Sequence, residues 1–157
     1  MAQKFTASEQ QLKPDPVYNS KLVSRFINCL MNKGKKSVSQ KLFYEAMAIV
    51  AKKLNDQDAV KVFETAVNNV KPMIEVRSKR VGGSSYQVPM QVSAKRQQSL
   101  AFRWIIQAAR GKKGKPMSQR LASELIDAYN KQGAAMTTIE NIHKMAEANK
   151  AFAHFAW

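Results

Sequence analysis

Cysteine, acidic residues and long apolar runs are scarce in this chain, and each shortage excludes a class of protein. The single cysteine, Cys29, cannot form an internal disulfide, which is typical of a reducing, intracellular compartment. No apolar run approaches the ~18 residues of a membrane span, so we expect no membrane partner. The first residues lack the charged-then-apolar pattern of a secretory signal, and Glu9 and Asp15 argue against a transit peptide.

The sequence also lacks the spacings of catalytic and metal sites. His143 and His154 are eleven residues apart, and no Cys-x-x-Cys or His-Glu-x-x-His motif occurs. Residues 111–116, GKKGKP, lack the GxxxxGK[ST] spacing of a phosphate loop and follow a predicted helix rather than a strand. We therefore expect no enzyme, no metal and no cofactor. The segment 111–116 is interpreted as a basic loop that contacts phosphates as charge.

Positive charge is what the chain has in excess. It carries 26 Lys and Arg against 11 Asp and Glu, a formal net charge of +15. Seventeen of these cations fall in two windows without any acidic residue, 16–44 and 76–123. Protein surfaces usually intersperse the two signs, whereas a face of one sign indicates a polyanionic partner. A merely solvated basic face is the less favoured alternative.

Helical periodicity dominates the remaining sequence and predicts one mainly α-helical domain of about six helices. The aromatic residues on the apolar stripes predict core positions at Phe26, Phe43, Phe63, Trp104 and Tyr129, and Met145 is expected to face inward on the last helix. The first three predicted helices run from a cap at Asn19 or Ser20 to Gly34, from a cap at Ser37 to Leu54, and from a cap at Asp56 or Asp58 to Pro72. The last three run from a cap at Ser93 to Gly111, from a first turn at Pro116 to Tyr129, and from about Gly133 through Ala146.

Residues 73–81 and 86–92 break the helical pattern and predict a β-hairpin between the third and fourth helices. Gly82 and Gly83 allow a tight turn at its tip and a close approach to a backbone. Tyr86, just after the turn, either stacks on a nucleic-acid base or pins the hairpin through a cross-strand pair, and the second interpretation is favoured.

Cations occupy both faces of the first predicted strand. Arg77 and Lys79 share one face, while Ser78 and Arg80 share the other. Such a strand cannot lie flat on an apolar core, so we expect the hairpin to protrude. A two-stranded arm that reaches into nucleic acid is favoured over a solvated surface ribbon.

The chain is expected to divide into an N-terminal tail, a helical domain and a short C-terminal extension. The tail, 1–16, is polar and ends in Pro-Asp-Pro, which cannot continue a helix. The domain spans 17–148 and includes the hairpin at 73–92, and the extension spans 149–157.

Several long motifs occur in one order along the chain. They are PDPVYNSKLVSRFINCLMNKGKKS at 14–37, RVGGSSYQVPMQV at 80–92, LAFRWIIQAAR at 100–110, RLASELIDA at 120–128 and MAEANKAFAHFAW at 145–157. With these motifs the chain resembles, over essentially its whole length, the family of the seventh small-subunit ribosomal protein, bacterial type.

The resemblance implies a structural constituent of the small ribosomal subunit. Members of that family bind the 3′ major domain of small-subunit ribosomal RNA directly and nucleate assembly of the subunit head. It also implies a cytoplasmic, ribosome-bound location, in a bacterial or an organellar ribosome, near the exit-site tRNA and the messenger RNA path. The implied protein neighbours include the eleventh and ninth small-subunit proteins. Relatives usually begin with a cluster of basic residues, whereas the tail here offers only Lys4 and Lys13.

The candidate RNA-binding residues neutralise phosphates, release counterions and let the hairpin tip approach a backbone. They cluster at the start of the second helix, on the hairpin, on the fourth helix and in the basic loop: Lys35, Lys36, Arg77, Lys79, Arg80, Gly82, Gly83, Lys95, Arg96, Arg103, Arg110, Lys112, Lys113 and Lys115.

Two alternatives stay open on the residues alone. An architectural DNA-binding protein also combines a basic helical body with β-arms. An RNA-processing enzyme is disfavoured because no acid–base constellation is present.

Overall fold

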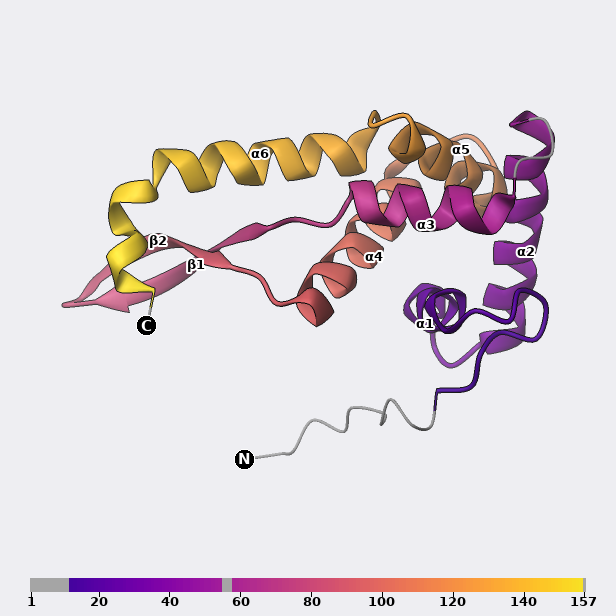
Figure 1. Cartoon of the computed structure of the whole chain (residues 1–157), viewed down its shortest axis with the longest axis horizontal. Coiled ribbons are helices and arrows are strands. Elements are labelled where there is room, and N and C mark those ends of the chain that lie inside the picture. Colours follow the sequence, from indigo (N-terminus) through magenta and orange to yellow (C-terminus); the bar gives the residue numbers. More distant parts are fainter. Residues whose placement is uncertain (1–11, 55–57, 157) are drawn as a thin grey trace.

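Six α-helices, one two-stranded sheet and a short 3-10 helix form the part of the chain that the structure, a computed structural model, describes: residues 12–54 and 58–156 (Figure 1). The predicted mainly helical domain with a hairpin between the third and fourth helices is confirmed. The elements are α1 Lys21–Leu30, α2 Lys36–Lys53, α3 Ala59–Asn69, β1 Ile74–Val81, β2 Ser84–Gln91, α4 Ala94–Gly111, α5 Met117–Tyr129, α6 Ala134–Ala148 and η2 Lys150–Phe155.

Side-chain caps start two helices as predicted. The Ser20 hydroxyl accepts a hydrogen bond from the Val23 N–H, and the Asp58 carboxylate accepts one from the Val60 N–H. The alternative cap Asp56 lies outside the described residues, as do residues 1–11 of the predicted tail and residue 157 of the predicted extension.

Two predicted boundaries around the first turn are wrong. The helix α1 ends at Leu30 rather than at Gly34, because Lys33 and Gly34 have φ angles of 50° and 74° and form the turn that leads into the next helix. Ser37 lies inside the first turn of α2, which begins one residue earlier at Lys36. A glycine at positive φ therefore marks the connection here and not the helix end.

Four phenylalanines form the centre of the core. The ring of Phe26 lies 5.6, 5.1 and 5.2 Å, between centroids, from Phe43, Phe63 and Phe102, and all four side chains are buried. The pairs with Phe63 and Phe102 are edge-to-face, and such pairs add to the free energy gained by burial. The three predicted core aromatics from α1, α2 and α3 are confirmed, and α4 contributes Phe102, which the sequence had not indicated.

The predicted phases of α4 and α6 are partly wrong. Trp104 is half-buried rather than buried, because the face of α4 that meets the core is the one carrying Phe102, Ile105 and Ile106. Met145 is 50% exposed, since the second half of α6 runs beyond the helical bundle and has a core on one narrow side only.

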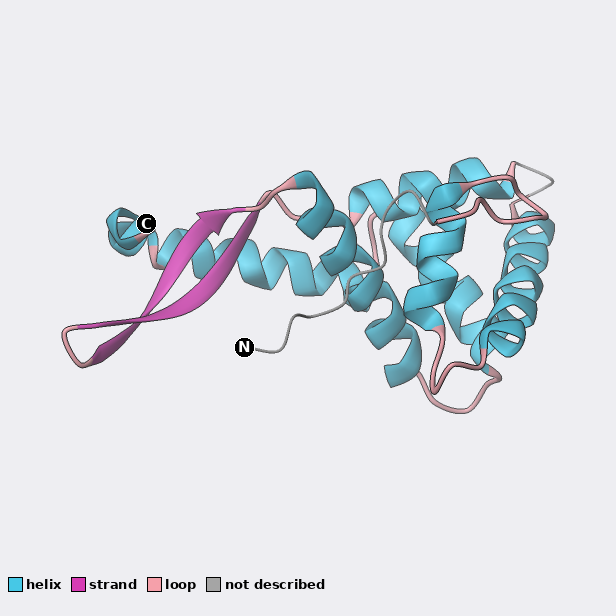
Figure 2. Ribbon diagram, turned by 90° about the horizontal axis from the view of Figure 1, so that it is seen from below, coloured by secondary structure: helices cyan, strands magenta, loops and turns pink. Residues whose placement is uncertain are grey.

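The hairpin extends away from the helical bundle, and other elements of the chain pack against it. Both views show α6 running along it, and α6 contacts β1 while η2 packs on β2 (Figures 1 and 2). The ring of Tyr86 lies 5.2 Å from Phe152 and 5.3 Å from Phe155. Its cross-strand neighbour is Lys79, which makes a cross-strand pair in the register but carries no ring. The C-terminal segment supplies the aromatic partners instead.

Candidate nucleic-acid interface

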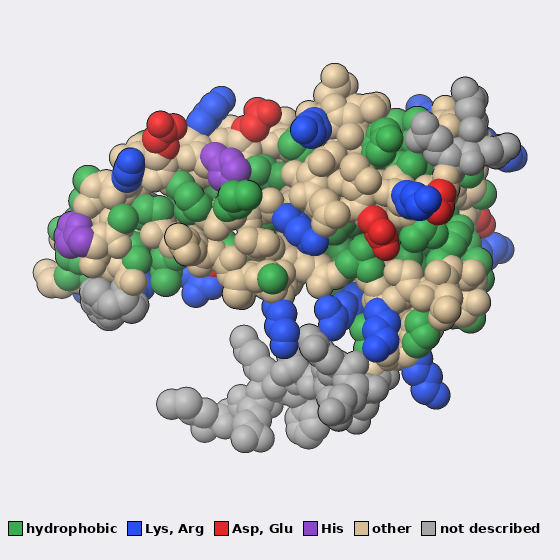
Figure 3. Space-filling view, viewed as in Figure 1, with side chains coloured by type: hydrophobic (Ala, Val, Ile, Leu, Met, Phe, Trp, Pro, Cys, Tyr) green, Lys and Arg blue, Asp and Glu red, His purple; other side chains and the backbone are tan. Residues whose placement is uncertain are grey.

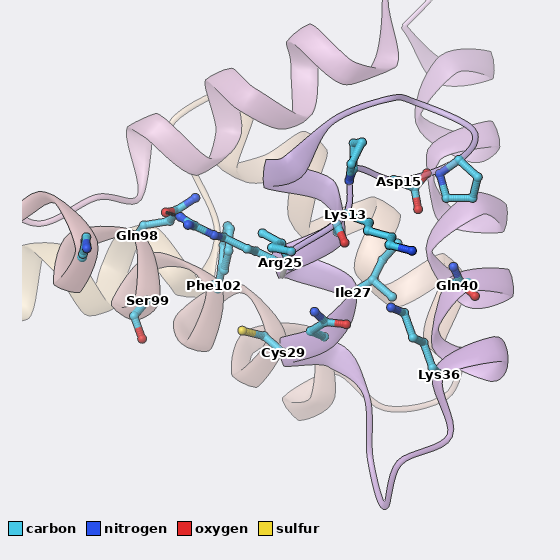
Figure 4. Close-up of a pocket in the computed structure, with 16 residues that line it drawn as sticks. Lys13, Asp15, Arg25, Ile27, Cys29, Lys36, Gln40, Gln98, Ser99 and Phe102 are labelled. Atoms are coloured by element: carbon cyan, nitrogen blue, oxygen red, sulfur yellow. Dashed lines mark hydrogen bonds between the residues drawn. The ribbon is translucent and has the colours of Figure 1, made fainter. Parts of the chain in front are cut away.

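A basic groove lies between the N-terminal segment and three helices. It has a volume of about 830 Å³ and is lined by residues 12–16, by α1 and by the starts of α2 and α4. Figure 4 shows Lys13, Arg25 and Lys36 among its lining residues, and Lys95 from α4 completes the set of cations. We call this feature the N-terminal groove.

The one acidic residue of the N-terminal groove is turned into the protein. Asp15 is 2% exposed, and its carboxylate accepts hydrogen bonds from the Val17 and Tyr18 N–H groups, each at 3.2 Å, and from the Tyr44 hydroxyl at 2.8 Å. Burial and the hydrogen bond to this carboxylate raise the pKa of Tyr44 to about 12. Asp15 therefore fixes the segment that forms one wall, while Lys13, Arg25, Lys36 and Lys95 line the groove.

The side chains of the groove also include donors, acceptors and an apolar floor. Arg25 donates a hydrogen bond to the Gln98 side chain at 3.1 Å, which joins α1 to α4. Buried Ile27 and Phe102 lie beneath. Cations gathered above buried apolar side chains suit a phosphate backbone better than a small apolar ligand.

The hairpin turns through Gly82 and Gly83, whose φ angles are 57° and 90°. Two successive positive φ angles are typical of the tight turns that match strand twist, and they confirm the predicted use of the two glycines in the turn. Arg80 is exposed beside this tip, opposite Ser85 in the register. The two-stranded hairpin thus presents an exposed cation near its tip.

One buried carboxylate organises the base of the hairpin. Glu75 is 8% exposed and forms ion pairs with Arg77 of the same strand and, at 3.2 Å, with Arg96 of α4. Lys79 donates a hydrogen bond to the Phe155 carbonyl at 3.1 Å. Two predicted phosphate-binding cations, Arg96 and Lys79, therefore also hold the arm against its neighbours, whereas Arg77 pairs within its own strand.

The far end of α4 carries cations with structural partners. Arg110 donates to the Leu30 carbonyl at the end of α1, and Lys112 forms ion pairs with two carboxylates of α5. Lys113 and Lys115 are exposed. The segment predicted as a basic loop does connect α4 to α5. Lys112 pairs with carboxylates of α5, whereas Lys113 and Lys115 face outward.

Several cations lie together along one edge of the face that Figure 3 shows. In Figure 3 lysine and arginine side chains lie along the lower edge, below α4 and α1, and others lie among the acidic side chains over α6 and α3. The sequence prediction placed Lys35, Lys36, Lys95 and Arg103 in the interface, and all four are exposed. It omitted Arg25, although this residue lies in the first acid-free window and one helical turn after another cation.

The described residues offer little for catalysis. No group of three or more His, Cys, Asp or Glu side chains is close enough to hold a metal ion in residues 12–54 and 58–156. Cys29 is exposed on α1, and desolvation of the thiol raises its pKa more than the nearby Arg103 lowers it, which makes the thiolate scarce at neutral pH. Over the same described ranges no helix is both long and apolar enough to cross a membrane.

Known proteins match the whole chain. The family model described as ribosomal protein S7p/S5e matches residues 2–150. The small ribosomal subunit protein uS7 of Rhodopirellula baltica is 57% identical over 98% of this chain and 99% of that protein, and its namesakes from Natranaerobius thermophilus and Desulfotalea psychrophila are 53% and 49% identical over all of both chains. Full-length identity at this level, together with the family match, means that the chain belongs to the ribosomal protein S7p/S5e family, whose members are structural components of the ribosome.

Proposed function

We propose that this chain, a structural constituent of the small ribosomal subunit, binds the 3′ major domain of small-subunit ribosomal RNA through the N-terminal groove and the hairpin. The observation that carries the proposal is the N-terminal groove, in which three helices and the N-terminal segment bring four cations together while the local carboxylate is buried. Specificity then comes from the fit of a folded RNA junction to a rigid surface, because bases in duplex RNA are hard to reach.

We also propose that the chain binds RNA early and nucleates assembly of the subunit head. The core that holds the groove is built from the chain's own helices, so the surface exists before any neighbouring protein arrives. The protruding arm with Arg80 near its tip suits a place by the exit-site tRNA and the messenger RNA path. The eleventh and ninth small-subunit proteins are the neighbours proposed for it, and a bacterial cytoplasm is the proposed home.

A titration of a 3′ major domain transcript over a range of salt concentrations tests the proposal. Replacement of Lys13, Arg25, Lys36 and Lys95 by Gln should weaken binding and lower the slope of log K against log salt by roughly three units, since each phosphate contact contributes about 0.7–0.9. The matched control replaces four exposed lysines elsewhere: Lys52, Lys53, Lys131 and Lys144.

The control variant should bind with nearly the parental slope. Equal losses in the two variants would show that net charge, and not the groove, governs binding. A competition against duplex DNA at the same salt decides the remaining alternative, because tighter binding to DNA than to the transcript would contradict a ribosomal RNA target.

A further inference from the structure

Lys112 does not face outward with the rest of the basic loop. It follows α4 directly, and its ammonium lies 2.8 Å from Glu124 Oε2, 2.8 Å from Asp127 Oδ2 and 3.2 Å from the Ser123 hydroxyl. The Lys112 side chain is 31% exposed, whereas that of Glu124 is completely buried. These contacts join the end of α4 to the middle of α5.

The same carboxylate holds the start of α6. Glu124 Oε1 accepts a hydrogen bond from the Ala135 N–H at 2.9 Å, in the first turn of that helix. An N-terminal helix end favours a negative charge, and the first N–H groups of a helix need acceptors from outside the helix. A continuous chain of contacts therefore runs from Lys112 through Glu124 to the helix that flanks the hairpin.

A positive charge is required at this point because a buried carboxylate without a partner is costly. Lys112 supplies that charge, and the pKa of its ammonium is raised because the hydrogen bonds and charges of Asp127 and Glu124 outweigh its desolvation. The backbone is fixed as well, since Arg120 donates hydrogen bonds to the carbonyls of Arg110 and Lys112.

The two other lysines of the loop differ in each of these respects. Lys113 and Lys115 are exposed and flank Gly114, which has a φ angle of 81°. Neither forms an ion pair with any residue in the described ranges 12–54 and 58–156. The loop thus has one cation committed to the interior and two that are available to a polyanion.

We propose that Lys112 is a positioning residue, which fixes the loop 112–116 and the start of α6 through Glu124 and Asp127, while Lys113 and Lys115 contact phosphate. This inference rests on the proposed RNA binding, and it assigns to Lys112 a role different from the phosphate contact predicted from the sequence.

Three single variants separate the roles: Lys112→Met, Lys113→Met and Lys115→Met. For each, thermal melting of the free protein and the salt slope of binding to the 3′ major domain transcript are measured. Lys112→Met should lower the melting temperature by about 10 °C, the loss expected when one partner of a buried ion pair is removed, and leave the slope unchanged. Lys113→Met and Lys115→Met should melt like the parent and each lower the slope by about 0.7–0.9.

A double variant covers the case in which Lys112→Met does not fold. Lys112→Met with Glu124→Gln removes the uncompensated charge, should recover much of the lost melting temperature and should retain the parental salt slope. A slope lowered by about one unit in either Lys112 variant would overturn the inference, and so would parental melting of Lys112→Met. If the unaltered protein bound the transcript without salt dependence, the proposed function itself would fail. The melting data would still decide whether Lys112 fixes the loop 112–116 and the start of α6.

Discussion

Among the six glycines, Gly133 is the one at which an added Cβ meets close neighbours. Its φ angle is 94°, and a Cβ built on it would lie 2.9 Å from the Cβ of Asp127 and 3.1 Å from Glu124 Oε1. Gly133→Ala should therefore combine backbone strain with a clash and reduce the free energy of unfolding by about 3 kcal/mol. Gly34→Ala is the control, because Gly34 also has a positive φ but nothing lies within 4 Å of its Cβ position. It should lose about 1 kcal/mol in the same urea titration.

Tyr44 provides a pH-dependent contribution to stability. Its pKa of about 12 in the folded protein lies above the value of 10.0 for the unfolded chain, because burial and the hydrogen bond to Asp15 favour the neutral phenol. The contribution is complete below pH 10 and is lost as the pH rises toward 12. Tyr44→Phe should be less stable than the parent at pH 8, and the difference should shrink between pH 10 and 12. A constant difference across this range would contradict the assigned hydrogen bond.

At the scale of elements, the phase of α4 decides which aromatic residue supports the core. Phe102 is buried against Phe26, whereas Trp104 is half-buried at the edge. We expect Phe102→Ala to cost about 4 kcal/mol and Trp104→Ala less than half of that, as measured by chemical denaturation. Equal losses would mean that α4 is rotated relative to the arrangement described.

The segments that form helices could be predicted from the sequence, whereas several contacts between these elements could not. The stripes that carry Phe26, Phe43 and Phe63 indicated three core faces, because apolar spacing is a local property. The phase error at Trp104 arose because Phe102 and Trp104 are both apolar, and the choice depends on which neighbouring helix is nearer. The partners of Tyr86 were out of reach, since Phe152 and Phe155 come from the far end of the chain.

The positive charge of the candidate interface could be predicted from the sequence. Which of its charged residues point outward and which pair inside the protein could not. The two windows without acidic residues contain Lys36 and Lys95, and the fold brings both to one groove. The sequence alone could not show that Asp15, just outside the first window, is turned inward by Tyr44, nor that Lys112 is committed to carboxylates in α5, because both facts depend on tertiary contacts.

The hairpin as an element should be separable from the helical core. Each buried residue of the main core cluster belongs to a helix or to its immediate end, and none lies in β1 or β2. Replacement of residues 75–90 by a short glycine linker should leave cooperative melting largely intact. The segment η2 and the second half of α6 would then lose their partner, so their amide hydrogens should exchange faster. Loss of cooperative melting would show that the arm supports the core.

At the scale of the whole molecule, the net charge of +15 should oppose folding in the absence of a polyanion. Salt screens the repulsion between these exposed like charges. The melting temperature of the free protein should therefore rise by roughly 2–4 °C, equivalent to about 1 kcal/mol, between 50 mM and 500 mM potassium chloride. The variant with Gln at Lys13, Arg25, Lys36 and Lys95 should show a smaller rise, and a fall in the parent would contradict the argument.

The packing of η2 on β2 also determines the order in which these parts of the fold can form during synthesis. Tyr86 is synthesised roughly 70 residues before its partners Phe152 and Phe155, which corresponds to about 3–14 s at 5–20 residues per second. During that interval the hairpin can form its own turn and backbone pairing, but the aromatic face of β2 has no cover. On the nascent chain, β1 and β2 can therefore pair several seconds before residues 150–155 are available to cover Tyr86.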